Sequence, residues 1–270
     1  MRGASRASFA SLRERLEAAV SGAADASVLG SELFAVVGLL DREHVVRRAL
    51  SDPGKPAAEK AALARTLLHE RVAPTTEELV ATAAESHWAR STDLADAIEQ
   101  LAIEAFVMSA EFEGKLDDLE DDLFRFGRVV AGQPRLRAAL EDVSLPDENK
   151  RNLLNALLGG KVSGVALILI SHVVTNPRGR SLPVALDVCA DIAAQRRQRL
   201  IAVVHTATPL TEAQRGRLAS ALAAAYGHEV YLNVVIDPSV VGGMSIQIGD
   251  ELIDGTVATR LAAIRRKLAA

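Results

Sequence analysis

Apolar residues recur every three or four positions from Ser11 to about Arg197. Within Ser31–Leu50 and Glu59–Arg71 they fall at Leu33, Val36, Val37, Leu40, Val45, Val46, Leu50, Leu63, Leu67 and Leu68. This spacing lines one face of an α-helix and leaves polar residues on the opposite face. The pattern predicts a series of amphipathic helices that bury their apolar faces against one another.

The ends of the predicted helices carry recognisable signals. Thr75-Thr76-Glu77-Glu78 is typical of a helix start with a capping hydroxyl and acids in the first turn, and Asp147-Glu148-Asn149 follows Pro146 in the same way. The most apolar run is Val162–Val174. It is shorter than the roughly 20 residues that a membrane-spanning helix needs, so it predicts a buried helix.

The helical region contains an internal repeat with a period of 90 residues. Without a gap, this shift aligns Leu33-Phe34 with Leu123-Phe124, Pro56 with Pro146, Lys60 with Lys150, Leu67-Leu68 with Leu157-Leu158, and Arg90-Ser91 with Arg180-Ser181. Alanine and leucine are common in this chain, but the absence of gaps and the aligned turn prolines favour a duplication over coincidence. The repeat predicts two tandem helical units.

The pattern changes after about Arg199. Short β-branched runs predict strands at Leu200–Val204 and Val230–Ile236, with a helix between them at Thr208–Tyr226 that Gly227 ends. A hairpin is predicted from Ser245–Ile248 and Leu252–Ile253 around Gly249-Asp250-Glu251, and a final amphipathic helix at Thr256–Leu268. The chain is therefore predicted to be mainly α. Two tandem helical-bundle units, an extra N-terminal unit at residues 1–95 and a bundle at 96–198, precede a small β-α-β-β-α domain at 199–270.

Composition and charge exclude several classes of protein. The chain is 49% hydrophobic but only 3% aromatic, so aliphatic side chains must fill the cores. A net charge of −4 argues against nucleic-acid binding. The single cysteine, Cys189, excludes an intramolecular disulfide and a cysteine-based zinc site, which fits a reducing cytoplasm. Met1–Ala10 lacks the apolar core of a signal peptide, and no direct membrane insertion is expected.

Candidate catalytic and metal sites are few. Gly160-Lys161 lacks the preceding strand and the glycine spacing of a phosphate loop and predicts a helix-ending turn. The six histidines include no pair at i, i+4 spacing and no neighbouring cysteine. No segment resembles a nucleophile elbow. The sequence therefore predicts no catalytic residue, no cofactor and no metal.

Three other segments have two interpretations. The acidic stretch Asp117–Asp122 is interrupted by Leu119, which favours a solvated helix face over a metal site. Gly242-Gly243, Gly249 and Gly255 lack the GxGxxG spacing, so turn geometry is favoured over a ligand cradle. The apolar stripe of the last helix would serve either the stability of the domain or the docking of a partner helix.

The segment Ile236–Val257 resembles the C-terminal signature of the delta subunit of bacterial F-type ATP synthases, the counterpart of the mitochondrial oligomycin-sensitivity-conferring protein. It carries that family's Asp-Pro-Ser turn, Gly-Gly pair, strand, Gly-Asp turn and Ile-Asp-Gly-Thr start of a final basic helix. Glu113–Asp117, Gly132–Leu140, Pro146 with Lys150, and Asn176–Pro183 resemble landmarks of the family's helical domain. The resemblance covers about residues 96–270, and the extra unit at 1–95 is similar to that of long, free-standing actinobacterial forms.

This resemblance implies a non-catalytic stator subunit that joins the catalytic head to the peripheral stalk at the cytoplasmic face of the plasma membrane. The implied partners are the N-termini of the alpha subunits and the b subunit of the stalk. The implied contacts with alpha are Ala102, Ile103, Phe106, Leu167, Ile170 and Val174. The stalk contact or family motif comprises Asp237, Pro238, Gly242, Gly243, Gly249, Ile253, Asp254, Gly255 and Leu261.

Two functions of other classes remain open from the sequence. One is a generic helical adaptor or scaffold that does not co-purify with alpha and b subunits. The other is an enzyme that binds a small ligand through the glycine-rich C-terminal domain. The duplication also leaves open which helical unit contacts which partner.

Overall fold

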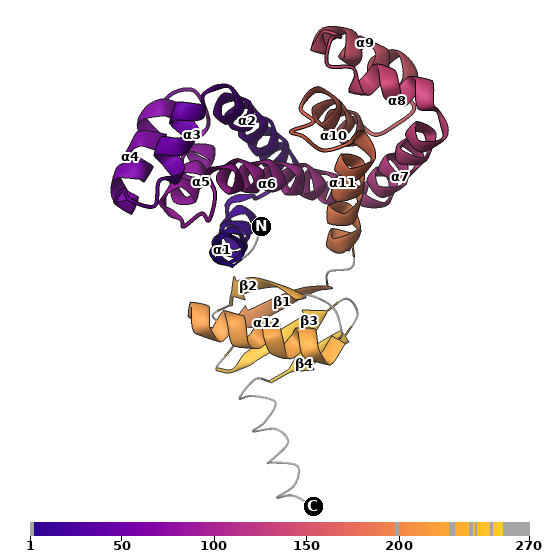
Figure 1. Cartoon of the computed structure of the whole chain (residues 1–270). Coiled ribbons are helices and arrows are strands. Elements are labelled where there is room, and N and C mark those ends of the chain that lie inside the picture. Colours follow the sequence, from indigo (N-terminus) through magenta and orange to yellow (C-terminus); the bar gives the residue numbers. More distant parts are fainter. Residues whose placement is uncertain are drawn as a thin grey trace, which may run out of the picture. The chain divides into compact units, whose positions relative to one another are not determined.

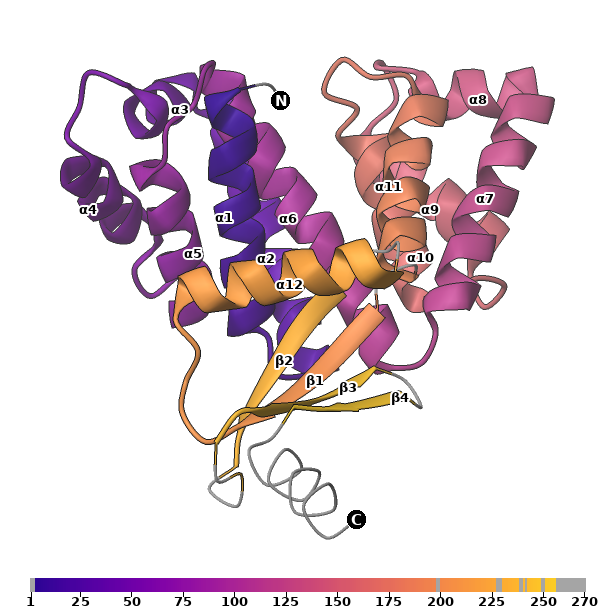
Figure 2. The same cartoon turned by 90° about the horizontal axis from the view of Figure 1, so that it is seen from below.

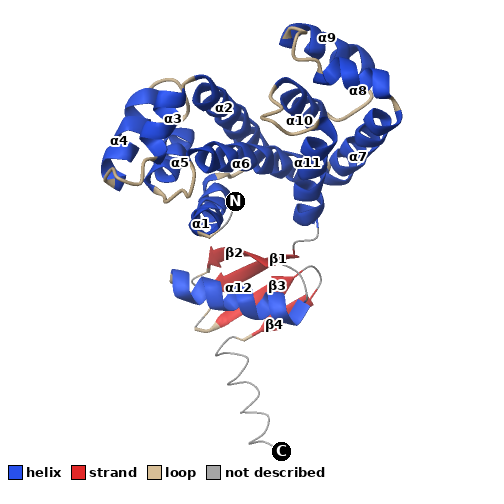
Figure 3. Cartoon of the chain, in the orientation of Figure 1, coloured by secondary structure: helices blue, strands red, loops and turns tan. Residues whose placement is uncertain are grey.

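A computed structural model of the chain describes residues 3–197, 200–226, 230–237, 240, 242–248 and 251–255 (Figure 1). The chain divides into two compact parts, a helical part at Met1–Ala194 and an α/β part at Gln195–Ala270. Within the described residues the secondary structure is mainly helical, and strands occur only in the α/β part (Figure 3). The predicted fold class is confirmed.

The helical part consists of helices joined by short turns. Their bounds are α1 (Ala4–Ala19), α2 (Ala23–Arg42), α3 (His44–Ser51), α4 (Ala57–Leu68), α5 (Pro74–Glu85), α6 (Ser91–Phe112), α7 (Leu116–Gly132), α8 (Pro134–Glu141), α9 (Asp147–Leu158), α10 (Gly164–Thr175) and α11 (Leu182–Arg197). No described helix has the length and hydropathy required to cross a membrane.

The segment Ser31–Leu50, which has the apolar spacing of helices, covers parts of two helices, α2 and α3. Glu43 has φ −104° and ψ 77°, outside the helical region, and separates α2 from α3. On one continuous helix Leu40 and Val46 would lie about 120° apart. The break at Glu43 lets both side chains face the same apolar interior.

The 90-residue repeat recurs in the helix boundaries. The bounds of α8, α9 and α10 follow those of α3, α4 and α5 by 90 residues. The turn after α4 has Glu70 at φ 59°, and the turn after α9 has Gly160 at φ 70°. Such left-handed positions are unusual for a glutamate, so the shared turn geometry fits a common origin of the two segments.

One helix serves both repeats. Residues 94–109, the equivalents of α1, lie within α6, which also follows α5 as the last helix of the first repeat. We call α1–α5 the first copy and α7–α11 the second copy, with α6 shared. In Figures 1 and 2, α3, α4 and α5 lie on one side of α6, and α7, α8 and α9 on the other. The proposed boundary after residue 95 falls inside this helix and stays a prediction about domain organisation.

Two hydrophobic cores meet along α6. The first includes Leu94, Ile98 and Leu101 of α6, and the second includes Ile103, Phe106 and Val107. The most extensive pairing of helices is that of α2 with α6. Gly30 permits it, because a Cβ atom there would lie 2.8 Å from the Phe106 ring.

The start of α5 differs from the prediction. Neither Thr75 nor Thr76 caps the helix, which begins at Pro74. Instead Glu32 of α2 accepts a hydrogen bond from the backbone N–H of Ala73 at 2.9 Å and another from the Thr76 hydroxyl. The second copy repeats this arrangement, since Asp122 accepts from the N–H of Ser163 at 2.7 Å. One backbone donor at each of these helix starts is thus satisfied by a side chain about 40 residues upstream.

The α/β part contains β1 (Leu200–Thr206), α12 (Glu212–Tyr226), β2 (Val230–Ile236), β3 (Met244–Ile248) and β4 (Glu251–Asp254). The sheet order is β2-β1-β3-β4, with β1 and β2 parallel and the other pairs antiparallel. The helix α12 covers one face of this sheet (Figure 3). The described order has one strand more than the predicted β-α-β-β-α, because both arms of the predicted hairpin are strands. The predicted last helix, Thr256–Leu268, lies outside the described residues.

Candidate interaction surfaces

The structure brings together the two segments predicted to face the alpha subunits. Ile103 and Phe106 of α6 and Ile170 and Val174 of α10 share the second hydrophobic core, with Leu167 packed against it and Ala102 in the first core. All except Leu167 are buried within the helical part. In this conformation a partner helix would reach their exposed neighbours, and a direct contact of these six residues with alpha stays a prediction.

Part of this face of α6 is covered by the first copy. The Phe34 ring of α2 stacks on Phe106 with centroids 5.4 Å apart and 27° between the planes. Phe34 was aligned with Phe124 by the repeat, but its helical position alone gave no sign that it reaches the second core.

Exposed large apolar side chains are concentrated on the second copy and its neighbours. Among the described residues of the first copy, only Val28 and Val45 belong to this class. From the end of α6 to α11 the class comprises Phe112, Phe124, Val129, Val143, Leu145, Leu157, Ile168 and Val184. These side chains lie on α6, α7, α9, α10, α11 and the α8–α9 turn.

The repeat provides an internal comparison for this surface. Phe124 is 59% exposed, whereas its equivalent Phe34 is packed against both cores. Ile168 replaces the charged Glu78 of the first copy, and Leu145 replaces Lys55. At these last two exposed positions the second copy is apolar where the first copy is charged, as expected of a surface that binds a partner.

The acidic stretch on α7 has the predicted arrangement. Asp117, Asp118 and Asp121 are exposed, while Leu119 and Leu123 are buried in the second core. Asp122 accepts from the backbone N–H of Ser163, and the Ser163 hydroxyl caps α10 by accepting from the Ala166 N–H at 3.2 Å. The described residues contain no group of three or more His, Cys, Asp or Glu side chains that could hold a metal ion.

In the α/β part, the described residues of the glycine-rich motif shape turns around β3 and β4. Gly242 and Gly243 have φ values of 138° and 80°, which glycine adopts without strain. The Gly255 N–H donates to the Met244 carbonyl at 3.0 Å, and a Cβ atom on Gly255 would lie 3.1 Å from that oxygen. These contacts fit the turn interpretation.

The other motif residues frame the same region. The Asp237 N–H donates to the Thr206 carbonyl at 2.9 Å. Ile253 pairs with Ile246 and is 38% exposed, and Asp254 pairs with Ser245. Pro238, Gly249 and Leu261 lie outside the described residues. The proposed contact of this motif with the stalk stays a prediction.

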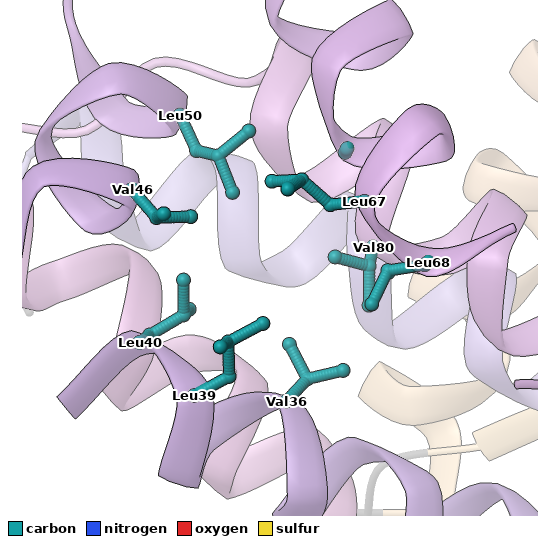
Figure 4. A pocket seen from close by; sticks show the side chains of 9 residues that line it. Val36, Leu39, Leu40, Val46, Leu50, Leu67, Leu68 and Val80 are labelled. Atoms are coloured by element: carbon teal, nitrogen blue, oxygen red, sulfur yellow. The ribbon is translucent and has the colours of Figure 1, made fainter. Parts of the chain in front are cut away.

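A small apolar pocket lies in the first copy, where helices α2 to α5 converge (Figure 4). It is lined by Val36, Leu39, Leu40, Val46, Leu50, Ala64, Leu67, Leu68 and Val80. No polar side chain lines it, so nothing there would orient a small molecule. The Cys189 thiol is also inert, because burial raises its pKa to about 12.

Comparison with known proteins agrees with this description. Residues 102–268 match the family described as ATP synthase delta (OSCP) subunit. The ATP synthase subunit delta of Thermobifida fusca is 46% identical over 269 residues, which cover 100% of both chains. That of Streptomyces avermitilis is 46% identical over 268 residues, which cover 99% of this chain and 98% of the relative. The long form with the first copy is thus similar to these relatives along their whole length.

A solved structure of the Toxoplasma gondii mitochondrial ATP synthase hexamer contains a chain that is 20% identical, with a TM-score of 0.30, over 62% of this chain and 95% of that one. This low TM-score adds nothing to the assignment. The match of the family over the second copy and the α/β part, with the full-length relatives, is sufficient: the chain belongs to the ATP synthase delta (OSCP) subunit family.

Proposed function

We propose that this chain is the non-catalytic stator subunit of a proton-translocating F-type ATP synthase, where it links the alpha/beta head to the b stalk and resists the torque of the rotor. The observation that carries this proposal is the full-length similarity to proteins named ATP synthase subunit delta, together with the family match over residues 102–268. A stator needs no turnover, only enough interface to withstand elastic load.

The head contact is proposed for the second copy. Its exposed apolar side chains, among them Phe124, Leu157 and Ile168, offer the kind of surface onto which an amphipathic helix packs. The exposed acids of α7 would favour a basic partner segment. The N-terminal segments of the alpha subunits are the proposed ligands of this surface.

The α/β part is proposed to hold the end of the b subunit, near Gly242, Gly243 and Ile253. The exposed Leu252 and Ile253 of β4 support this, because they leave apolar surface at an edge strand. The chain is proposed to lie at the cytoplasmic face of the plasma membrane as a peripheral component of the complex. Neither nucleic-acid binding nor membrane insertion is part of this proposal.

The experiment that tests the head contact uses the full chain. Phe124→Ala and Ile168→Ala remove exposed apolar side chains of the second copy, and Val45→Ala is the matched control at a first-copy position that is 79% exposed. Binding to a peptide from the alpha N-terminus is measured for each variant. We expect weaker binding for the two second-copy variants and none of this loss for the control.

Equal binding by all three variants would contradict the assignment of the head contact to the second copy. Failure of the full chain to co-purify with alpha and b subunits would overturn the stator function itself and favour a generic helical adaptor.

The role of the first copy is best tested with point substitutions. Deletion of residues 1–95 would remove the first turn of α6, including Leu94, and strip Ile98 and Leu101 of their packing partners in the first core. If such a deletion uncoupled ATP hydrolysis from proton pumping, the effect would therefore reflect damage to the shared helix as much as loss of the first copy.

A further inference from the structure

A buried group of charges lies where the two copies meet. Glu99 of α6 is 2% exposed and is the centre of this group. Its carboxylate accepts hydrogen bonds from Arg180 Nη2 at 2.6 and 2.7 Å and from Arg178 Nη1 at 3.0 Å. His172 Nε2 lies 3.2 Å from Glu99 Oε1. Both arginines belong to the turn between α10 and α11, so the second copy encloses this carboxylate of the shared helix.

Arg178 extends the group to the first copy. Its Nε lies 3.0 Å from Asp41 Oδ2 on α2, and its Nη2 lies 3.0 Å from Asp96 Oδ1 on α6. The Arg178 side chain is only 11% exposed, and its backbone has φ 48°. One guanidinium thus joins α2, α6 and the α10–α11 turn, through ion pairs with Asp41 and Asp96 and a charge-assisted hydrogen bond to Glu99.

The same helix α2 makes a second contact with the second copy, two turns earlier. The Phe34 ring stacks on the His172 ring, with centroids 3.6 Å apart and 9° between the planes. Phe34 and Asp41 are seven positions apart and therefore lie on one face of α2. This face is held at one point by ring stacking and at another by an ion pair.

The repeat shows which of these groups are particular to the second copy. The first-copy equivalents of Glu99, His172 and Arg178 are Phe9, Thr82 and Trp88. All three are buried, and Phe9 and Trp88 belong to the first hydrophobic core. Arg180 corresponds to Arg90, which pairs with the buried Asp93 at 2.8 Å, so the first copy has two aromatic rings beside one charge pair. Glu99, His172 and Arg178 are particular to the second copy, and His172 and Arg178 are the residues that contact α2.

We propose that Asp41, Arg178 and Glu99 form a latch that fixes α2 of the first copy on the second copy, so that the two copies behave as one rigid body. The ion pair of Asp41 with Arg178 is the charged contact that joins α2 to the α10–α11 turn, while Asp96 and Glu99 of α6 hold the guanidinium in place. Loss of Asp41 therefore removes a directional contact between the copies without leaving Arg178 unpaired. The use of this rigidity under load rests on the proposed stator function, whereas the latch itself does not.

Hydrogen exchange of the full chain, measured by mass spectrometry on peptides, tests the latch. Asp41→Asn and Arg178→Gln each break the contact between α2 and the α10–α11 turn, and Asp41→Glu keeps the charge. Glu78→Gln is the matched control, because it breaks the exposed pair with Arg65, 2.9 Å, inside the first copy. Since Asp41 is 30% exposed, its conservative variants are expected to fold even if a substitution of Glu99 does not.

We expect exchange in α2 and in the α10–α11 turn to become about tenfold faster in Asp41→Asn and Arg178→Gln, with α4 and α9 unchanged. Asp41→Glu should restore most of the protection. An equal rise in α4 and α9, or no rise beyond that of Glu78→Gln, would overturn the latch. Because the isolated chain is measured, this failure would leave the proposed stator function untouched.

Discussion

The ring of Phe34 lies flat on the imidazole of His172, 3.6 Å away, and so ties α2 to α10 across the boundary between the copies. Its repeat equivalent, Phe124, is 59% exposed and has Arg128 over its ring at 5.9 Å. The same residue type at the same repeat position thus packs inside the helical part in one copy and faces solvent in the other. The difference in exposure between Phe34 and Phe124 therefore comes from tertiary contacts and not from residue type or repeat position.

Substitution of each phenylalanine should reflect this difference. Phe34→Ala removes two ring contacts and leaves a void between the cores, so we expect a loss of about 2 kcal/mol or more in the free energy of unfolding. Phe124→Ala should change it by less than about 0.5 kcal/mol. Urea unfolding monitored by circular dichroism measures both. Similar losses for the two variants would contradict the arrangement of α2 on the second core.

The close pairing of α2 and α6 makes a prediction about Gly30. Alanine at this helical position gains up to about 1 kcal/mol from helix propensity, but its Cβ atom would lie 2.8 Å from the Phe106 ring. We expect Gly30→Ala to destabilise the protein by about 1–3 kcal/mol. Gly127→Ala on α7 is the matched control, because a Cβ there meets nothing within 4 Å. The control should raise the thermal midpoint, and an equal rise for Gly30→Ala would show that α2 and α6 are farther apart.

The buried carboxylates predict the response to acid. Burial raises the pKa of Glu99, but the hydrogen bond from His172 and the charges of Arg180 and Arg178 outweigh it, so the pKa lies below its usual value. Asp93 is similar, since the Ser5 and Arg90 hydrogen bonds outweigh burial and lower its pKa. A lowered pKa in the folded protein gives stability that is present above the unfolded value, about 4, and is lost as pH falls through the folded value.

The urea midpoint is therefore expected to stay level from pH 7 to about 5 and to fall below about pH 4. Asp96 works in the opposite direction, because burial raises its pKa and its protonation offsets part of the loss. Glu99→Gln should be less stable at pH 7 and should show a shallower fall in acid. Glu14→Gln, at an exposed acid of α1, should keep the wild-type profile. A fall in Glu99→Gln as steep as in the wild type would show that Glu99 does not contribute to the acid response.

Much of the helical architecture follows from local patterns. Core positions such as Leu33 and Leu123, and turn prolines such as Pro56 and Pro146, recur because each turn and each apolar face is set by nearby residues. Helix starts were less predictable. Thr76 matched a local capping pattern, yet the N-cap residue of α5 is Ala73, and its N–H bonds to Glu32, which no rule based on neighbouring residues could identify.

The candidate surfaces were harder to predict for a related reason. The resemblance to the delta-subunit family implies that Ile103 and Ile170 contact the alpha subunits, but a resemblance does not say which neighbouring helices cover an apolar side chain. Both are buried among the helices of the second core. The contacts of Glu99, Arg178 and Asp41 join segments far apart in the chain, so they become visible only when the helices are assembled. Comparison of the two copies, position by position, is the signal that could have pointed to them.

The pocket in the first copy yields a final prediction from this comparison. At the positions of Val36, Ala64 and Val80, the second copy has Phe126, Leu154 and Ile170, which are bulkier and buried. Figure 4 shows the labelled first-copy side chains around a common apolar space. Val80→Ile adds one methylene group to this apolar space, and we expect it to stabilise the protein by about 0.5–1 kcal/mol. The reciprocal change Ile170→Val should destabilise it by about 0.5–1.5 kcal/mol, because it removes a methylene group from a packed site.

Urea midpoints of the two variants, measured with the wild-type protein, check both signs at once. Trp88, the single tryptophan, lies in the first core, so its fluorescence reports directly on the unfolding of Val80→Ile. A loss of stability in Val80→Ile would mean that the neighbouring leucines cannot move apart to admit the added carbon. The difference in residue size between the copies would then reflect two separately packed cores rather than an unfilled space in the first.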